Sequence, residues 1–168
     1  MGSENISVVF TPIIGEMAHG TLVYTNSSGE QFYAGATRSS WATPTTAANA
    51  LQAEVSQIGG IGSDPLGTLI AFSGVVTPDL NASGPTKNWF NSTNASATLL
   101  SGSDLSSQWG VISNTMGEIN NLNLQYAPIT QNSNSSWCTA ALNAGVSYSD
   151  LSAAQTSTQA SCTERVIT

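Results

Sequence analysis

Charge is the scarcest property of this sequence. Only 8% of its 168 residues are charged, and three basic residues stand against ten acidic ones, which gives a net charge of −7. A nucleic-acid-binding surface needs clustered cations to displace phosphate counterions, so we expect no nucleic-acid partner. Ser, Thr, Asn and Gly fill the places of charged residues, and the surface is expected to consist largely of neutral hydroxyls and amides.

Long hydrophobic runs are also missing. No stretch approaches the roughly 20 apolar residues that cross a bilayer, so no membrane span is expected. The first residues, Met1–Asn5, have neither the basic region nor the apolar region of a signal peptide. We therefore expect a protein that is secreted without such a peptide, or one that lies in the cytoplasm before a secretion machinery delivers it.

Cysteine and histidine are rare, with two cysteines and one histidine in the chain. Cys138 and Cys162 are too few for a disulfide-built fold, but one disulfide between them would close a loop worth about 3 kcal/mol. One histidine and two distant cysteines give no zinc-binding spacing, so no metal site is expected. The glycine-rich stretch 59–62 lacks the Lys-Ser/Thr pair of a phosphate loop, and no cofactor is expected either.

The periodicity of the chain predicts both strands and helices. Asn26–Gly29 is a turn between two β-rich segments, which indicates a hairpin, and Pro12 is expected to end the strand before it. Predicted strands are Ile6–Phe10, Gly20–Thr25, Gln31–Gly35 and Gly67–Thr77. Predicted helices are Pro44–Ile58, Asp104–Asn120 and a segment from Asn134 or Ser135 to Asn143, with a weaker one over Asp150–Ser161.

These elements indicate one α+β domain over residues 1–168, with a small antiparallel sheet packed against three or more helices. Leu22 and Tyr24 are predicted to share one face of the hairpin, with His19, Thr21 and Val23 on the other. Residues 79–103 are polar and are predicted to form a long loop, which Trp89 and Phe90 interrupt.

His19 and Cys138 carry the clearest catalytic chemistry in the chain. His19 lies in a predicted strand, and Cys138 lies near the start of a predicted helix. A helix N-terminus and a neighbouring imidazolium both lower the pKa of a thiol, and the thiolate is the nucleophile in cysteine-based acyl transfer. If the strand packs against the helix, Cys138 is predicted to be the nucleophile and His19 the general base.

The polar residues ahead of Cys138 could serve the same site. Asn134, Ser135 and Ser136, with the first free backbone N–H groups of the helix, could donate to a developing oxyanion. Each is also a good helix cap, and capping is the preferred interpretation of any one of them. Ser135 could instead be the nucleophile. For Cys138 the structural alternatives are a buried apolar side chain or a disulfide to Cys162.

A histidine strand followed by a late cysteine helix resembles the circularly permuted papain-like (NlpC/P60-type) hydrolases of bacteria. The matching segments are His19–Tyr24 and Asn134–Cys138. The resemblance implies a permuted papain-like fold and an amidase or peptidase that cuts a peptide or peptidoglycan-like substrate. Some members are toxins, which implies an antibacterial effector with an immunity or secretion partner. The family more often has Asn or Asp directly before the cysteine, where this chain has Trp137.

A second hypothesis is a non-enzymatic secreted module that binds a glycan or a protein. Its contact surface would be the neutral Ser/Thr/Asn-rich exterior together with Trp89 and Phe90, and Cys138 would be bonded to Cys162. The state of Cys138 separates the two hypotheses. A free and reactive thiol favours the hydrolase, and a disulfide favours the binding module.

Overall fold

The computed structural model describes residues 2–14, 17–38, 67–76, 94–126, 132–156 and 167. The strands form one antiparallel sheet in the order β4-β3-β2-β1-β5, so this part of the chain has the predicted α+β class. The elements are β1 (Glu4–Ile14), β2 (Met17–Thr25), β3 (Gln31–Arg38), β4 (Leu69–Val75), β5 (Ala95–Gly102), α2 (Ser106–Asn121), α3 (Ser133–Asn143) and α4 (Tyr148–Thr156).

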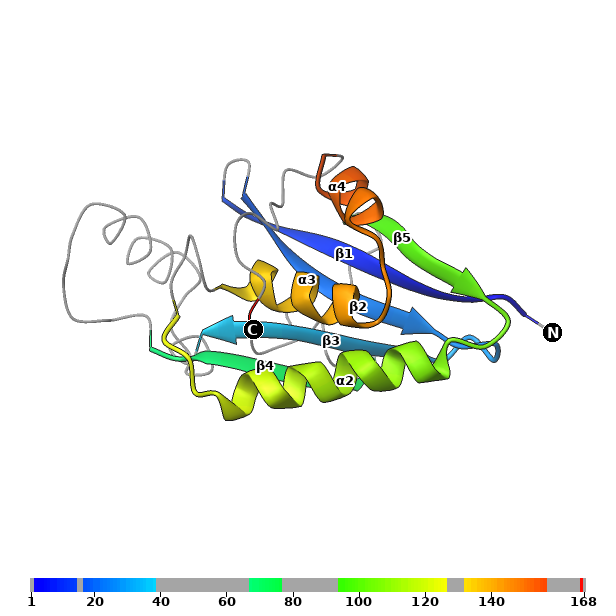
Figure 1. Ribbon diagram of the computed structural model, residues 1–168. Coiled ribbons are helices and arrows are strands. Elements are labelled where there is room, and N and C mark those ends of the chain that lie inside the picture. The colour runs from blue at the N-terminus through cyan, green and yellow to red at the C-terminus, as the bar shows by residue number, and fades with distance from the viewer. Residues whose placement is uncertain are drawn as a thin grey trace.

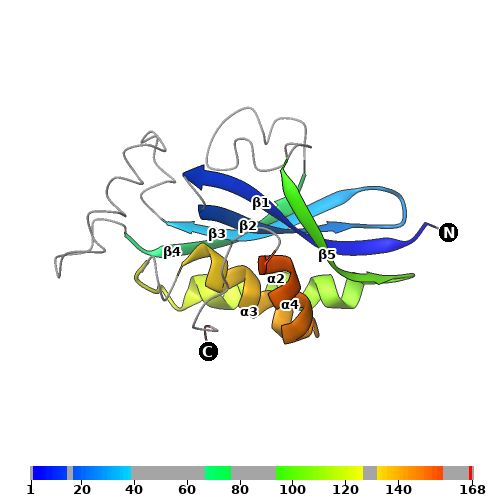
Figure 2. The same cartoon turned by 90° about the horizontal axis from the view of Figure 1, so that it is seen from above.

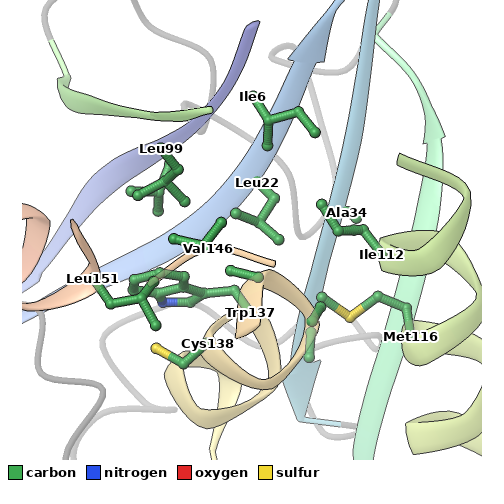
Figure 3. Close-up of a cluster of buried hydrophobic side chains, with 14 of the residues drawn as sticks. Ile6, Leu22, Ala34, Leu99, Ile112, Met116, Trp137, Cys138, Val146 and Leu151 are labelled. Atoms are coloured by element: carbon green, nitrogen blue, oxygen red, sulfur yellow. The ribbon is translucent and has the colours of Figure 1, made fainter. Parts of the chain in front are cut away.

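The molecule has two layers. Figure 2 shows the sheet nearly edge-on, with α2, α3 and α4 all against the same face. Apolar side chains of that face pack against apolar side chains of the helices and form the hydrophobic core (Figure 3). The sheet contributes Ile6, Val8, Phe10, Leu22, Tyr24, Ala34, Ala36, Leu69, Ala71 and Leu99, and the helices contribute Ile112, Met116, Ile119, Trp137, Ala140, Ala141, Leu151 and Ala154.

The predicted hairpin is confirmed. β2 and β3 pair from Leu22↔Ala34 to Thr25↔Gln31, and the Asn26 N–H donates to the Glu30 carbonyl at 3.0 Å across the turn. Gly29 has φ of +84°, a left-handed conformation that glycine adopts without steric cost.

The prediction that Pro12 ends the first strand is wrong, because β1 continues to Ile14. β1 pairs with β5 only as far as Phe10↔Ala95, whereas its pairing with β2 continues beyond Pro12. The backbone N–H and C=O groups of successive residues in a strand point alternately to its two neighbouring strands. The N–H of Gly20 points away from β1, so its pair Phe10 directs its backbone groups to β5, and so does Pro12 two residues on. At Pro12 the pairing with β5 has ended. The missing N–H therefore breaks no hydrogen bond of the sheet.

The predicted loop over 79–103 is also wrong at its end, where Ala95–Gly102 form β5. Ala95 and Ala97 alternate with hydroxyl residues, but they are small and Leu99 is the one buried side chain of β5, so the apolar alternation is too weak to mark a strand. Trp89, Phe90 and the predicted helix Pro44–Ile58 lie outside the described residues.

The longest helix follows its prediction within two residues at either end. Helix α2 buries Ile112, Met116 and Ile119 along one stripe. The N-cap of α2 is Leu105, and no side chain caps the helix. The Asp104 carboxylate, one residue earlier, accepts hydrogen bonds from the backbone N–H and the hydroxyl of Ser106 at 3.0 and 2.6 Å, which forms a local turn ahead of the helix.

Strands β2 and β3 separate toward one end of the sheet. Leu22↔Ala34 is their last pair, while β2 continues alongside β1 to Met17 and β3 continues alongside β4 to Arg38. Figure 1 shows the two strands diverging from the hairpin, with α3 crossing the face where they part. Helix α3 packs against both strands.

Gly20 is the point where α3 meets β2. The N–H of Gly20 lies on the side that β3 has left, and it donates instead to Oδ1 of Asn134 at 2.9 Å. The same oxygen accepts from Nε1 of Trp137 at 3.2 Å. The Trp137 indole lies directly over Gly20 and meets the Phe10 ring edge-on, with ring centroids 6.0 Å apart. We call this contact of Gly20, Asn134 and Trp137 the α3 anchor.

The anchor predicts that Gly20→Ala is strongly destabilising. A Cβ on Gly20 would lie 2.7 Å from Cδ1 of the fully buried Trp137, closer than packed atoms approach. We expect a loss of about 1–3 kcal/mol in the free energy of unfolding, measured by urea denaturation. Gly117→Ala is the matched control, because a Cβ there meets nothing within 4 Å. Because Gly117 is an exposed position within α2, this substitution should raise the free energy of unfolding by about 1 kcal/mol. Equal effects of the two substitutions would contradict the anchor.

Candidate functional site

His19 and Cys138 lie on opposite sides of the sheet. Gly20 faces the helices, because a Cβ on it would meet Trp137. Side chains alternate along a strand, so the imidazole of His19 points to the other face of the sheet. The side chain of Thr11, which pairs with His19, points to that face as well. Cys138 lies in α3, on the helical side (Figure 3). The structure does not bring together the two groups that a thiol hydrolase needs.

Cys138 is not a thiol in this structure. Its sulfur is bonded in a disulfide, and the residue is only 2% exposed. The one other cysteine of the chain is Cys162, which lies outside the described residues. Helix α3 begins at Ser133, so Cys138 is in its second turn, where the helix dipole has little effect. Cys138 therefore lacks a free sulfur, solvent access and the electrostatic help that the catalytic hypothesis requires.

The polar residues ahead of Cys138 hold the helix in place. Asn132 is the N-cap, and its Oδ1 accepts from the N–H groups of Asn134 and Ser135 at 2.8 and 3.0 Å. The Ser135 hydroxyl accepts from the Asn132 N–H at 2.8 Å, which completes a capping box. The Ser136 hydroxyl donates to the Asn132 carbonyl at 3.1 Å. Asn134, Ser135 and Ser136 thus act in capping and anchoring, and Ser135 does not present a free hydroxyl.

His19 belongs to a buried polar group on the sheet face that the described helices leave uncovered. It is 2% exposed, and burial lowers the pKa of the imidazole to about 4. Thr21, on the same strand, and Thr37, on the neighbouring strand β3, are buried as well, and their hydroxyls have no hydrogen-bond partner among the described residues. A neutral imidazole at physiological pH is expected there.

A buried carboxylate that the sequence did not reveal lies at the opposite end of the sheet. Oε2 of Glu4 accepts from the backbone N–H of Leu105 at 2.7 Å and from the Tyr24 hydroxyl at 2.8 Å. Oε1 accepts from the N–H of Ser27 at 3.1 Å. These bonds tie β1 to the hairpin turn and to the start of α2. Nothing in the local pattern distinguishes Glu4 from a solvated acid near a chain end.

The same bonds shift two titrations. The Leu105 N–H, followed by the Tyr24 hydroxyl, lowers the pKa of the Glu4 carboxyl below its usual 4.5. Burial, with the hydrogen bond to Glu4 second, raises the pKa of Tyr24 to about 12. Both shifts favour the observed state, an ionised carboxylate that accepts from a neutral phenol.

Neither a metal nor a membrane is indicated by the described part of the chain. It holds no group of three or more His, Cys, Asp or Glu side chains that could ligate a metal ion. Among the same residues, no helix combines the length and the apolar character needed to cross a lipid bilayer.

Searches against models of protein families, curated proteins and solved structures found no match to this chain. The resemblance to permuted papain-like hydrolases therefore stays a hypothesis based on local pattern.

The lowered pKa values of His19 and Glu4 predict that the protein loses stability in acid in two steps. The His19 pKa falls from 6.5 in the unfolded chain to about 4 in the fold, so the unfolded state binds the proton first. The free energy of unfolding therefore keeps its full value above pH 6.5 and falls by about 3 kcal/mol as the pH drops toward 4. The lowered pKa of Glu4 adds a second loss as pH falls below 4.5. The free energy of unfolding against pH, from urea titrations, measures both steps.

Two variants assign the steps. His19→Gln should flatten the curve between pH 6.5 and 4 and leave the lower step, whereas Glu4→Gln should remove the lower step and lower the Tm at neutral pH. A wild-type curve that is flat from pH 6.5 to 4 would contradict the buried, neutral state of His19.

Proposed function

We propose that this chain is a non-enzymatic binding module that works in an oxidising compartment and binds neutral carbohydrate. The disulfide at Cys138 supports the proposal most directly, because it makes the candidate nucleophile a buried structural cross-link. Disulfides persist mainly in secreted and periplasmic proteins, since cytosolic reductants open them. A cysteine hydrolase has no corresponding support, because His19 and Cys138 are separated by the sheet.

The composition of the surface favours a neutral ligand. Only 8% of the residues are charged, and Ser, Thr and Asn supply donors and acceptors without a strong field. Sugars are neutral polyols that pair with such groups, and their C–H faces pack on aromatic rings.

Tyr148 is the exposed aromatic side chain that suits this ligand. It is 72% exposed at the start of α4, and it is the one aromatic residue among the exposed large apolar side chains of the described segments. Its neighbours in sequence, Ser147, Ser149 and Asp150, are exposed as well and carry side-chain oxygen atoms. The Ser147 hydroxyl donates to Asp150 at 2.6 Å and holds the start of α4 in place. Such a ring beside fixed oxygens can combine stacking with hydrogen bonding.

The first test is the state of the cysteines. Thiol titration of the unreduced protein, native and unfolded, is expected to find no free thiol. The double variant Cys138→Ala, Cys162→Ala should lose about 3 kcal/mol in the free energy of unfolding. Two titratable thiols in freshly purified native protein would remove the support for the binding module and reopen the hydrolase hypothesis.

The second test is carbohydrate binding. The intact protein is applied to an array of neutral oligosaccharides, and hits are measured by calorimetry. Tyr148→Ala is expected to raise Kd about tenfold, which corresponds to roughly 1.4 kcal/mol, whereas Tyr148→Phe keeps the ring and most of the affinity. Leu122→Ala, at the end of α2, is the matched control, since Leu122 is 52% exposed but aliphatic. Absence of binding to every glycan would end the carbohydrate proposal, and affinity insensitive to Tyr148→Ala would exclude this surface.

A further inference from the structure

In the part of the chain that the structure describes, the outer side of β5 is an unpaired sheet edge. β5 pairs with β1 on one side only and ends the sheet, as Figure 1 shows. No backbone group of the described residues pairs with its other side. The opposite edge is partly covered, because the N–H of Leu69 in β4 donates to the Leu124 carbonyl and Thr68 forms a bridge with Gln125.

Alternation along the strands identifies the outward groups. Gly20 turns its N–H away from β1, so its pair Phe10 directs its own backbone groups to β5, and Phe10 pairs with Ala95 there. Ala95 and Ala97 thus face β1, and the backbone groups of Ser96 and Thr98 point outward. The register shift near Leu99 makes Ser101 the next outward residue. Ser96, Thr98 and Ser101 are all exposed.

This edge carries few of the devices that keep strands apart. Residues 95–102 include no proline and no charged side chain, although the molecule has a net charge of −7. The register shift at Leu99 is the one feature of β5 that hinders pairing with another strand. It leaves the backbone groups of Ser96, Thr98 and Ser101 pointing outward. A long neutral edge of this kind pairs readily with another extended strand.

The side-chain pattern of β5 is complementary to itself. Ala95, Ala97 and Leu100 pair with core residues of β1 on the helical face, and hydroxyl side chains occupy the other face. Two antiparallel copies related by a two-fold axis through Thr98 would place apolar groups beside apolar groups and hydroxyls beside hydroxyls. No like charges would meet along the two strands.

We propose that β5 pairs with β5 of a second copy of this chain, which joins the five described strands of each copy into one ten-stranded sheet. Thr98 lies opposite Thr98 of the second copy, and their backbone groups exchange hydrogen bonds. Because a single strand pair buries less surface than a stable dimer needs, the dimer forms at high protein concentration and dissociates on dilution. The pairing is independent of carbohydrate binding at Tyr148.

Sedimentation velocity of the intact protein from micromolar to millimolar concentration tests the pairing. Wild-type protein is expected to shift from monomer to dimer. Thr98→Lys and Thr98→Glu each place like charges opposite each other and should raise the dissociation constant at least about fivefold. An equimolar mixture of the two variants should restore the dimer, because opposite charges then meet. That rescue would not occur if the substitutions only perturbed the fold.

Ser73→Lys is the matched control, because Ser73 is an exposed residue of β4, the other edge strand. It should leave dimerisation unchanged. A wild-type protein that stays monomeric at millimolar concentration would overturn the proposal. A dimer that survives in Thr98→Lys, or one that Ser73→Lys abolishes, would overturn it as well, since a different surface would then carry the association.

Discussion

The fold depends on how α3 is held where β2 and β3 part. One oxygen, Oδ1 of Asn134, accepts from the Gly20 backbone and from the Trp137 indole, and so joins strand to helix. The bond to Gly20 replaces the one that β3 no longer supplies, and without it a buried N–H would lack a partner. Glycine is required because the indole occupies the space of a side chain. The strand separation and the helix position are therefore one constraint.

The same constraint decides the chemistry. Because Gly20 faces Trp137, its neighbour His19 must face away, and no small rotation of α3 brings Cys138 to the imidazole. The helix itself is buried on most of its circumference, with eight of its side chains among the buried residues. Polar groups in such a helix must be paired within the protein. Thr139, for example, donates to the Ser135 carbonyl at 2.7 Å and accepts from the Ile167 N–H at 2.9 Å.

Local pattern predicted those elements whose stability is local or strongly periodic. The hairpin has a turn signal, and α2 has a complete apolar stripe through Ile112, Met116 and Ile119. β5 has neither, because an edge strand with one buried side chain is stabilised by its pairing with β1. The hydrogen bonds of Glu4 to Tyr24 and Leu105 join distant segments, and no window of sequence contains them.

The site prediction had the necessary signal within it. The predicted alternation put Leu22 and Tyr24 on one face and His19 on the other, and the structure confirms this division. A leucine and a tyrosine seek the face that helices cover, so the alternation already placed the imidazole away from the predicted cysteine helix. The catalytic hypothesis required the opposite face. Pairing two reactive residues across a fold therefore calls for a check of strand parity first, because a shift of one residue reverses the direction of every side chain.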